Sequence, residues 1–118
     1  MGKIVIEVPE IPRGPNGPDG LLRLKWRGRR KYFKNWVLWI RAGVSFFPEV
    51  AAVVRCRVRI HQVRRQKLDP DNLSASCKPI LDALQKLNFI HDDSEKWIDL
   101  DVTQEIGREK QTVITIEA

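Results

Sequence analysis

Cysteine and long apolar runs are scarce in this sequence of 118 residues, and each scarcity excludes a class of protein. The two cysteines, Cys56 and Cys77, are widely spaced among apolar neighbours. That is not the spacing of a zinc site or a disulfide framework, so we expect buried free thiols. No segment approaches the ~20 apolar residues of a membrane span, and the apolar run near the N-terminus is too short for a signal peptide. We therefore expect one soluble, cytoplasmic domain over residues 1–118, with no membrane partner.

Basic residues outnumber acidic ones, at 21 Lys and Arg against 15 Asp and Glu, so the formal net charge is +6. Such an excess is typical of proteins that neutralise phosphates. Seven cations fall within residues 23–34, with Trp26 and Tyr32 between them. This pattern indicates a phosphate-binding arm, and a solvated charge run is the alternative. The candidate nucleic-acid-binding residues of the arm are Arg27, Arg29, Arg30 and Lys31.

A second basic pattern follows in residues 54–61, where apolar side chains alternate with Arg55, Arg57, Arg59 and His61. A period of two predicts a strand with one face in the core and a row of cations ~6.6 Å apart on the other face. That spacing is close to the spacing of successive phosphates in a nucleic-acid strand. We expect Arg55, Arg57 and Arg59 to bind nucleic acid, and an edge strand protected by charge is the alternative.

The patterns along the chain predict an α+β (mixed α/β) fold, with a single mixed sheet of about four strands packed against two helices. Alternation predicts further strands at residues 3–8, 97–105 and 112–117, the last two joined as a final hairpin. Four of the seven prolines lie in residues 9–20, which predicts an irregular loop. Apolar residues at helical spacing predict a helix over residues 30–42, with its aromatic side chains in the core, and a second helix from Asp71 onward.

Residues 69–93 begin and end with carboxylates, although the chain as a whole is basic. Asp69 and Asp71, on either side of a proline, suit the cap and the first turn of a helix. Taken alone, these two acids need no further function. An EF-hand is excluded, because Leu73 and Ile80 stand where that loop requires ligands.

The face of the second helix carries further charges. At 100° per residue, Lys78 and Asp82 return close to the direction of Asp71, and the simplest interpretation is an i,i+4 contact between Lys78 and Asp82. Pro79 removes a backbone donor and predicts a kink near Ala75. Carboxylates crowded around one segment repel one another, so we expect a cation to offset that repulsion or the acids to lie far apart.

Three motifs together resemble the RusA family of Holliday junction resolvases: "DPDN" at residues 69–72, "KPILDAL" at residues 78–84 and "DDS" at residues 92–94. The resemblance implies a RusA-like endonuclease, a homodimer that binds four-way DNA junctions and cuts two strands using Mg²⁺, in a bacterial, phage or prophage context. On the matching positions it implies catalytic and metal-binding roles for Asp69, Asp71 and Asp93, and a catalytic role for Lys78. The interval between Asp71 and Lys78 is longer by about one helical turn than in the best-known member.

Phosphodiester hydrolysis explains why these residue types would be used. The reaction needs a deprotonated water and relief of negative charge, which carboxylate-bound Mg²⁺ or Mn²⁺ supplies. We expect Asp92 to support Asp93 or to replace it as a metal ligand, and Lys78 to stabilise the scissile phosphate as a point charge. Two alternatives remain, a metal-dependent nuclease for other branched or single-stranded nucleic acid, and a non-catalytic DNA-binding module in which the acids only cap a helix.

Overall fold

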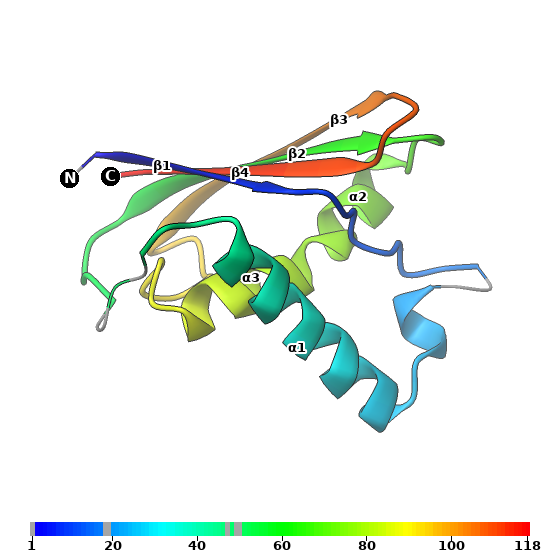
Figure 1. The fold of residues 1–118 in the computed structure, drawn as a ribbon, viewed down its shortest axis with the longest axis horizontal. Helices are drawn as coiled ribbons and strands as arrows, with labels where there is room; N and C mark the ends of the chain where they lie inside the picture. Colours follow the sequence, from blue (N-terminus) through cyan, green and yellow to red (C-terminus); the bar gives the residue numbers. More distant parts are fainter. Residues whose placement is uncertain (1, 18–19, 47, 49–50) are drawn as a thin grey trace.

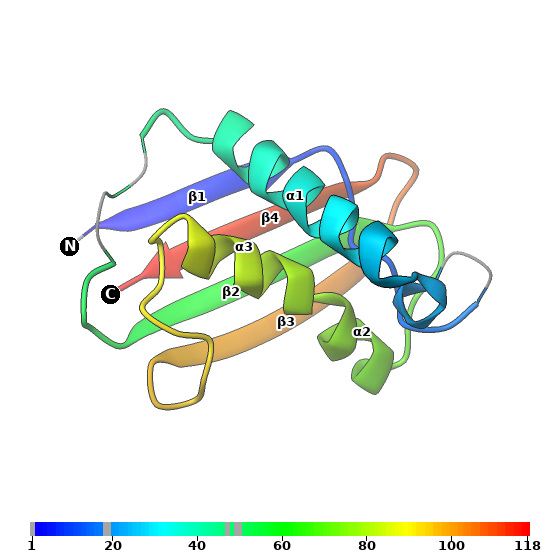
Figure 2. The same ribbon diagram turned by 90° about the horizontal axis from the view of Figure 1, so that it is seen from below.

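The structure, a computed structural model, describes residues 2–17, 20–46, 48 and 51–118. Its strands are β1 (Lys3–Val8), β2 (Cys56–Arg64), β3 (Ile98–Ile106) and β4 (Gln111–Glu117). Its helices are α1 (Trp26–Ala42), α2 (Pro70–Ser76) and α3 (Lys78–Lys86), with a short 3₁₀ helix, η1, at Leu21–Arg23. The strands form one mixed sheet, and α1 and α3 lie against the same face of it (Figures 1 and 2). The predicted α+β class is confirmed.

The strands lie in the order β1-β4-β2-β3, with β4 antiparallel to both of its neighbours and β3 parallel to β2. The predicted final hairpin is therefore wrong, because β2 lies between β3 and β4. The two strands differ in how much they bury. Ile114 and Ile116 of β4 are almost fully buried, whereas Leu100 and Ile106 of β3 are 37% and 64% exposed. The more apolar strand thus takes an inner place in the sheet, and the more polar one forms an edge.

The turn from β3 to β4 passes across the end of β2, and Gly107 makes this crossing possible. The amide of Gly107 donates a hydrogen bond to the carbonyl of Arg64 at 2.9 Å. A Cβ atom at Gly107 would lie 2.4 Å from Cγ1 of Val63. Because a valine side chain has little freedom to move aside, any other residue here would displace the turn or the strand.

The core lies between the sheet and the two longer helices. Trp36 and Ile40 of α1, Ile80 and Leu84 of α3, and Ile60 of β2 are all fully buried there. Burying each large apolar side chain contributes roughly 1.5–3 kcal/mol. The prediction that the aromatic side chains of this helix lie in the core is confirmed for Tyr32 and Trp36, whereas Phe33 and Trp39 are half-buried against it.

Helix α1 is longer than predicted, since it begins at Trp26 rather than at residue 30. The basic residues 27–31 are consequently helical and do not form an irregular arm. Tyr32 is buried, and its hydroxyl accepts a hydrogen bond from the amide of Arg13 at 2.8 Å. Among the described residues, no helix is long and apolar enough to cross a membrane.

The segment before α1 is irregular, as predicted. Residues 9–17 and 20 form neither helix nor strand, while Pro18 and Asp19 of the predicted loop lie outside the described residues. The hydroxyl of Thr112 donates to the carbonyl of Glu10 at 2.6 Å, which fastens the start of this segment to β4.

Both cysteines are buried free thiols, as predicted. Burial raises the pKa of the Cys56 thiol, and it raises the pKa of Cys77 to about 11. A thiol held protonated in this way is a poor nucleophile and a poor metal ligand at neutral pH. Cys56 and Cys77 therefore serve as core side chains.

Candidate active site

The first two acids of the "DPDN" motif stand at the start of α2. Asp69 is the N-cap, and its Oδ1 and Oδ2 accept hydrogen bonds from the amide and the Nδ2 of Asn72, each at 2.9 Å. This confirms the predicted cap. Asp71 lies exposed in the first turn, and no ion pair is found for it within the described part of the chain.

The residue before the cap is tied to the edge strand of the sheet. The side-chain amide of Gln104 in β3 accepts from the amide of Leu68 at 3.0 Å and donates to the carbonyl of Leu68 at 2.7 Å. These paired bonds reproduce the pattern of a strand neighbour, so they fix the backbone that leads into Asp69. The position of the carboxylates is thus set by β3 as well as by α2.

The chain turns between α2 and α3 at Cys77, two positions after the predicted kink site at Ala75. A buried side chain from β2 holds this junction: Nε2 of Gln62 donates to Oγ of Ser76 at 3.1 Å and to Sγ of Cys77 at 3.3 Å. The other end of that amide, Oε1, accepts from Nη1 of Arg64 at 2.6 Å. Gln62 therefore fixes the start of α3, and with it Lys78, relative to the sheet.

Lys78 connects two of the three motifs in space. Its ammonium group lies 3.0 Å from Oδ1 of Asp82, which confirms the predicted i,i+4 contact, and it also donates a hydrogen bond to Oδ2 of Asp93. The hydrogen bond to Asp93, followed by the one to Asp82, raises the pKa of Lys78. The lysine is therefore charged at neutral pH and joins "KPILDAL" to "DDS".

Asp92 and Asp93 differ in their surroundings. The amide of Asp93 donates to Oδ1 of Asp92 at 2.9 Å. This bond, with a further one from the hydroxyl of Ser94, lowers the pKa of Asp92. Asp92 is thus held as a carboxylate by the loop itself, whereas the partner of Asp93 is Lys78.

The donors suit a hard cation, but they are not assembled into a cage. Within the described residues, no three His, Cys, Asp or Glu side chains lie in a group that could hold a metal ion. Mg²⁺ needs no such cage, because it is often bound by one or two carboxylates together with substrate phosphates and water. The chemistry of Asp69 and Asp71 fits that mode. The structure does not bring Asp93 together with them as the third ligand.

Two of the predicted nucleic-acid-binding arginines lie beside the site. Arg29 lines a hollow of about 370 Å³ that also includes Lys78 and Asp82. Arg55 lines a second hollow, of about 440 Å³, together with Asp93, and its Nε donates to the carbonyl of Glu95 at 3.3 Å. Each half of the Lys78–Asp93 pair therefore opens onto a hollow with an arginine on its wall.

Four other basic residues of α1 line a separate hollow at its N-terminal end. This hollow, of about 450 Å³, is lined by Trp26, Arg27, Arg30, Lys31 and Lys34. The guanidinium group of Arg30 lies 5.6 Å from the centre of the Trp26 ring, and Trp26 is 70% exposed. Cations around an exposed indole are a combination found in proteins that bind single strands of nucleic acid.

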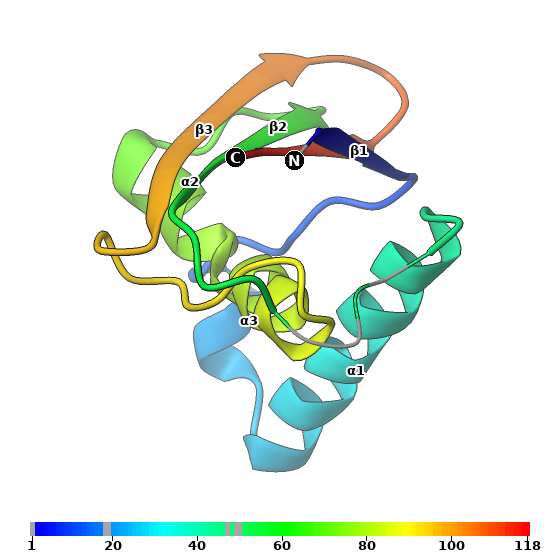
Figure 3. The ribbon, with the colours of Figure 1, turned by 90° about the vertical axis from the view of Figure 1, so that its left-hand side faces the viewer.

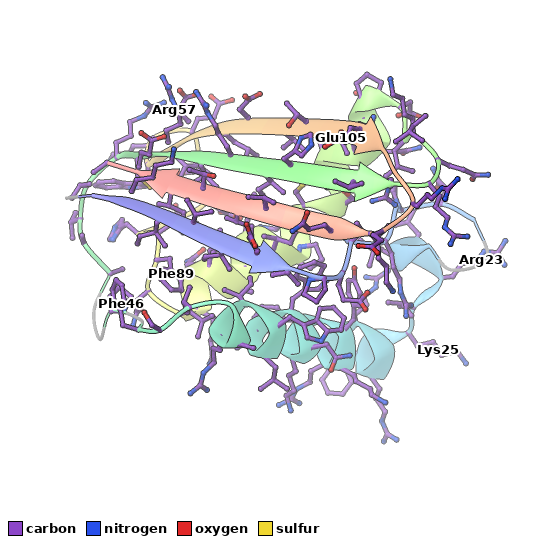
Figure 4. All side chains as sticks on the ribbon, turned by 45° about the horizontal axis from the view of Figure 1, so that its top comes forward. Arg23, Lys25, Phe46, Arg57, Phe89 and Glu105 are labelled. Atoms are coloured by element: carbon purple, nitrogen blue, oxygen red, sulfur yellow. The ribbon has the colours of Figure 1, made fainter. Side chains whose placement is uncertain are left out.

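Arg57 and Arg59 lie on the opposite face of the sheet, which no described helix covers (Figure 3). In Figure 4, Arg57 and Glu105 stand on this face near opposite ends of the sheet. Arg57 is 3.6 Å from Asp99, and Arg59 is in register with Asp101. The cation row is thus matched by acids of β3, which reduces its attraction for phosphates. The role of these two arginines stays a prediction.

Sequence reasoning did not identify Asp82 as a neighbour of Asp93 or Gln62 as a support of the site. The position of Asp82 in "KPILDAL" predicts its contact with Lys78, but the second contact of Lys78 depends on the path of the loop after α3. Gln62 has a clearer signal, since it is a polar residue on the apolar face of a strand.

Comparison with known proteins adds no family assignment. No family model matches the chain, and a search of curated proteins finds no match.

Proposed function

We propose that the chain is a divalent-metal-dependent endodeoxyribonuclease of the RusA type, which resolves four-way DNA junctions as a homodimer by hydrolysing phosphodiester bonds. The observation that carries the proposal is the contact of Lys78 with Asp93. It joins two motifs that are separate in the sequence, and an arginine lines the hollow on each side of it. A cation between carboxylates, with one arginine on the wall of each adjoining hollow, suits a phosphodiester substrate.

Each residue would have a distinct task. Asp69 and Asp71 offer hard oxygen ligands, and metal binding would draw in further ones from Asp92 and Asp93, on the loop before β3, which the structure does not bring together with them. The chemistry that a bound Mg²⁺ or Mn²⁺ supplies is neutralisation of phosphate charge and a lowered pKa of a water molecule. Lys78 would donate to a non-bridging or leaving oxygen of the phosphate, and its raised pKa keeps it charged for that task.

The residues around the pair would orient the substrate. Arg29 and Arg55 would contact the phosphates on either side of the scissile one, since they line the two adjoining hollows. Such contacts position a strand without reading its sequence. Selectivity for a junction would then come from the shape of the branched DNA and from the pairing of two subunits.

The direct test is cleavage of a mobile four-way junction in the presence of Mg²⁺ and in the presence of EDTA. We expect paired nicks with the wild type in Mg²⁺, none in EDTA, and a rate at least about 100-fold lower for Asp71→Asn. Asp101→Asn is the matched control, because Asp101 is an exposed acid on the uncovered face of the sheet. An intact junction with the wild type, or an Asp71→Asn variant as fast as the control, would overturn the proposal.

A second candidate is a metal-dependent nuclease for single-stranded or other branched nucleic acid. The exposed Trp26 with its surrounding cations favours this substrate class, because an exposed aromatic side chain can stack on an unpaired base. Digestion of junction, fork, single-stranded, duplex and RNA substrates side by side separates the two candidates.

The non-catalytic alternative is supported by the hydrogen bonds of Asp69, both of whose oxygens are used in capping α2. Titration of Mn²⁺ into the wild type and into Asp71→Asn separates it from an enzyme. A helix cap gives no metal binding that depends on Asp71.

A further inference from the structure

A wide hollow lies away from Lys78, at the end of the sheet where β2 leads into α2. It measures about 860 Å³. Its walls come from the segment after β1, from the β2–α2 segment and from the β3–β4 turn, which lie together on the right of Figure 1. We call this hollow the basic pocket, after the cations that line it, Arg64, Arg65, Lys67, Arg108 and Lys110.

The charges of the basic pocket are unbalanced. Glu109 is the one acid among its lining residues. Lys110 forms an ion pair with Glu10, which does not line the pocket, and its Nζ lies 2.9 Å from Oε2 of that residue. Arg65, Lys67 and Arg108 are exposed, and within the described residues no ion pair is found for them. Several cations held around one concave surface repel one another, and an anion placed among them would offset that repulsion.

Arg64 adds a cation that is almost buried at the inner wall. It is 8% exposed, and its Nη1 donates to two neutral acceptors, the carbonyl of Pro12 at 2.8 Å and Oε1 of Gln62 at 2.6 Å. Within the described residues, no carboxylate lies within ion-pair distance of it. A buried guanidinium group without a carboxylate partner is costly, and a phosphate is an anion that its fork of N–H donors fits.

Apart from Gln66, the uncharged walls are apolar, and they lead toward the candidate active site. Pro9, Ile11 and Leu68 line the pocket together with the cations. Apolar side chains beside phosphate-binding cations suit a nucleotide unit, which has an apolar sugar face and base as well as its phosphate. Leu68 directly precedes Asp69, so the pocket ends one residue from the first candidate metal ligand.

We propose that the basic pocket binds consecutive phosphates of a DNA strand and directs that strand toward Asp69 and Asp71. The choice of DNA as the ligand rests on the proposed function, whereas the preference for a phosphate follows from the pocket itself. The cations concerned were not among those that the sequence patterns single out, because Arg108 and Lys110 come from a short turn and join Arg64, Arg65 and Lys67 only in the folded chain.

Binding without cleavage tests the pocket independently of the nuclease activity. A fluorescein-labelled four-way junction is titrated with protein in EDTA, at several salt concentrations, and its anisotropy is measured. We expect the double variant Lys67→Gln/Arg108→Gln to bind about tenfold or more weakly than the wild type. We also expect the slope of log K against log salt to become shallower by about 2, close to one unit per lost phosphate contact.

The control is Lys3→Gln/Lys86→Gln, which removes the same amount of charge from exposed lysines outside the pocket. Equal binding by the two double variants would overturn the proposal, even if the wild type cuts junctions. Weaker binding by the pocket variant alone would support it, even if no cleavage is ever found. If dAMP at the same concentration as the junction displaced it fully, the pocket would be a site for a free nucleotide, and the proposal would also be overturned.

Discussion

Lys78 and Asp93, fifteen residues apart in the sequence, share a hydrogen bond between an ammonium group and a carboxylate. The same ammonium group contacts Asp82 at 3.0 Å. One cation thus satisfies two of the acids that the sequence crowds around residues 69–93. Asp69 is satisfied separately, by Asn72, and Asp92 accepts from the amide of Asp93, which leaves Asp71 as the carboxylate of the set for which no partner is found within the described residues.

Removal of Lys78 should affect activity far more than stability. We expect Lys78→Ala to lower the single-turnover rate of junction cleavage by about 100-fold, because a positioned positive charge is lost. The free energy of unfolding should fall by less than about 1 kcal/mol, because the lysine side chain is 62% exposed and solvent screens the pair. Single-turnover cleavage assays measure the rate, and urea denaturation measures the free energy of unfolding. Lys86→Ala is the control, and similar rates for the two variants would show that Lys78 has no catalytic task.

The exposed indole of α1 should matter for single strands. We expect Trp26→Ala to weaken binding of single-stranded DNA by about 1–3 kcal/mol, as one stacked base is lost, with no change in thermal stability. Leu38→Ala, a second exposed apolar residue of α1, is the matched control. Equal affinities for the two variants in an anisotropy titration would remove the support for the single-strand candidate.

The buried amide of Gln62 should be important for stability. Replacement by methionine keeps much of its volume but removes the hydrogen bonds that Gln62 makes with Oγ of Ser76 and Nη1 of Arg64, which should cost about 1–3 kcal/mol. Gln85→Met, on the exposed face of α3, should change stability by less than about 0.5 kcal/mol. Urea denaturation of the two variants measures the difference. A Gln62→Met variant as stable as the control would show that the hydrogen bonds of Gln62 do not hold the α2–α3 junction.

The turn over the end of β2 should tolerate no side chain. We expect Gly107→Ala to lower the free energy of unfolding by about 1–3 kcal/mol, because its Cβ would overlap Val63. Gly2→Ala meets no atom within 4 Å and should be neutral. Thermal denaturation of both variants measures the difference in stability. A Gly107→Ala protein as stable as Gly2→Ala would mean that the turn can move without a loss of stability.

Alkaline pH should weaken the fold through Cys77. Below the ordinary pKa of 9.0 its thiol is protonated in both the folded and the unfolded chain, so it has no effect on stability there. Between pH 9.0 and about 11 the unfolded chain releases the proton while the folded chain keeps it, so stability falls, by at most about 3 kcal/mol. Above about 11 both states have lost the proton and the loss levels off.

The control for this pH effect is Cys77→Ala, measured by urea denaturation across the same range. The titration of Lys78 also removes stability as pH rises through its raised pKa, and that contribution is present in both proteins. The wild type should therefore lose more stability than Cys77→Ala over this range. Parallel curves for the two proteins would contradict the assignment to Cys77.

Local signals in the sequence were sufficient for β1, for the cap at Asp69 and for the contact of Lys78 with Asp82. Each of these depends on residues close together in the chain, where propensity and spacing act directly. The order of the strands was not predictable in this way. Residues 98–106 and 111–117 both alternate and are joined by a short turn, so a hairpin was the natural expectation, and the decision depends on which strand buries more apolar surface.

The same distinction between local and long-range contacts applies to the candidate site. The sequence identifies which residue types form the motifs. The contact of Lys78 with Asp93, however, depends on the loop after α3 returning to the start of that helix. The predicted start of α1, at residue 30, lies four residues after the observed start at Trp26 for a related reason. Residues 26–29 carry charge and a glycine, with no acidic residue in the first turn, so no local signal marks the start of the helix at Trp26.

The place of β4 has a consequence for how the chain is made. β4 is the last of the four strands to leave the ribosome, yet β1 and β2 both pair with it. Until it emerges, the edges of β1 and β2 that β4 covers have unsatisfied backbone groups, which are sites for pairing with other chains. Folding must therefore be completed after synthesis of residues 111–117. A premature stop in the final strand would leave an aggregation-prone polypeptide rather than a slightly shorter protein.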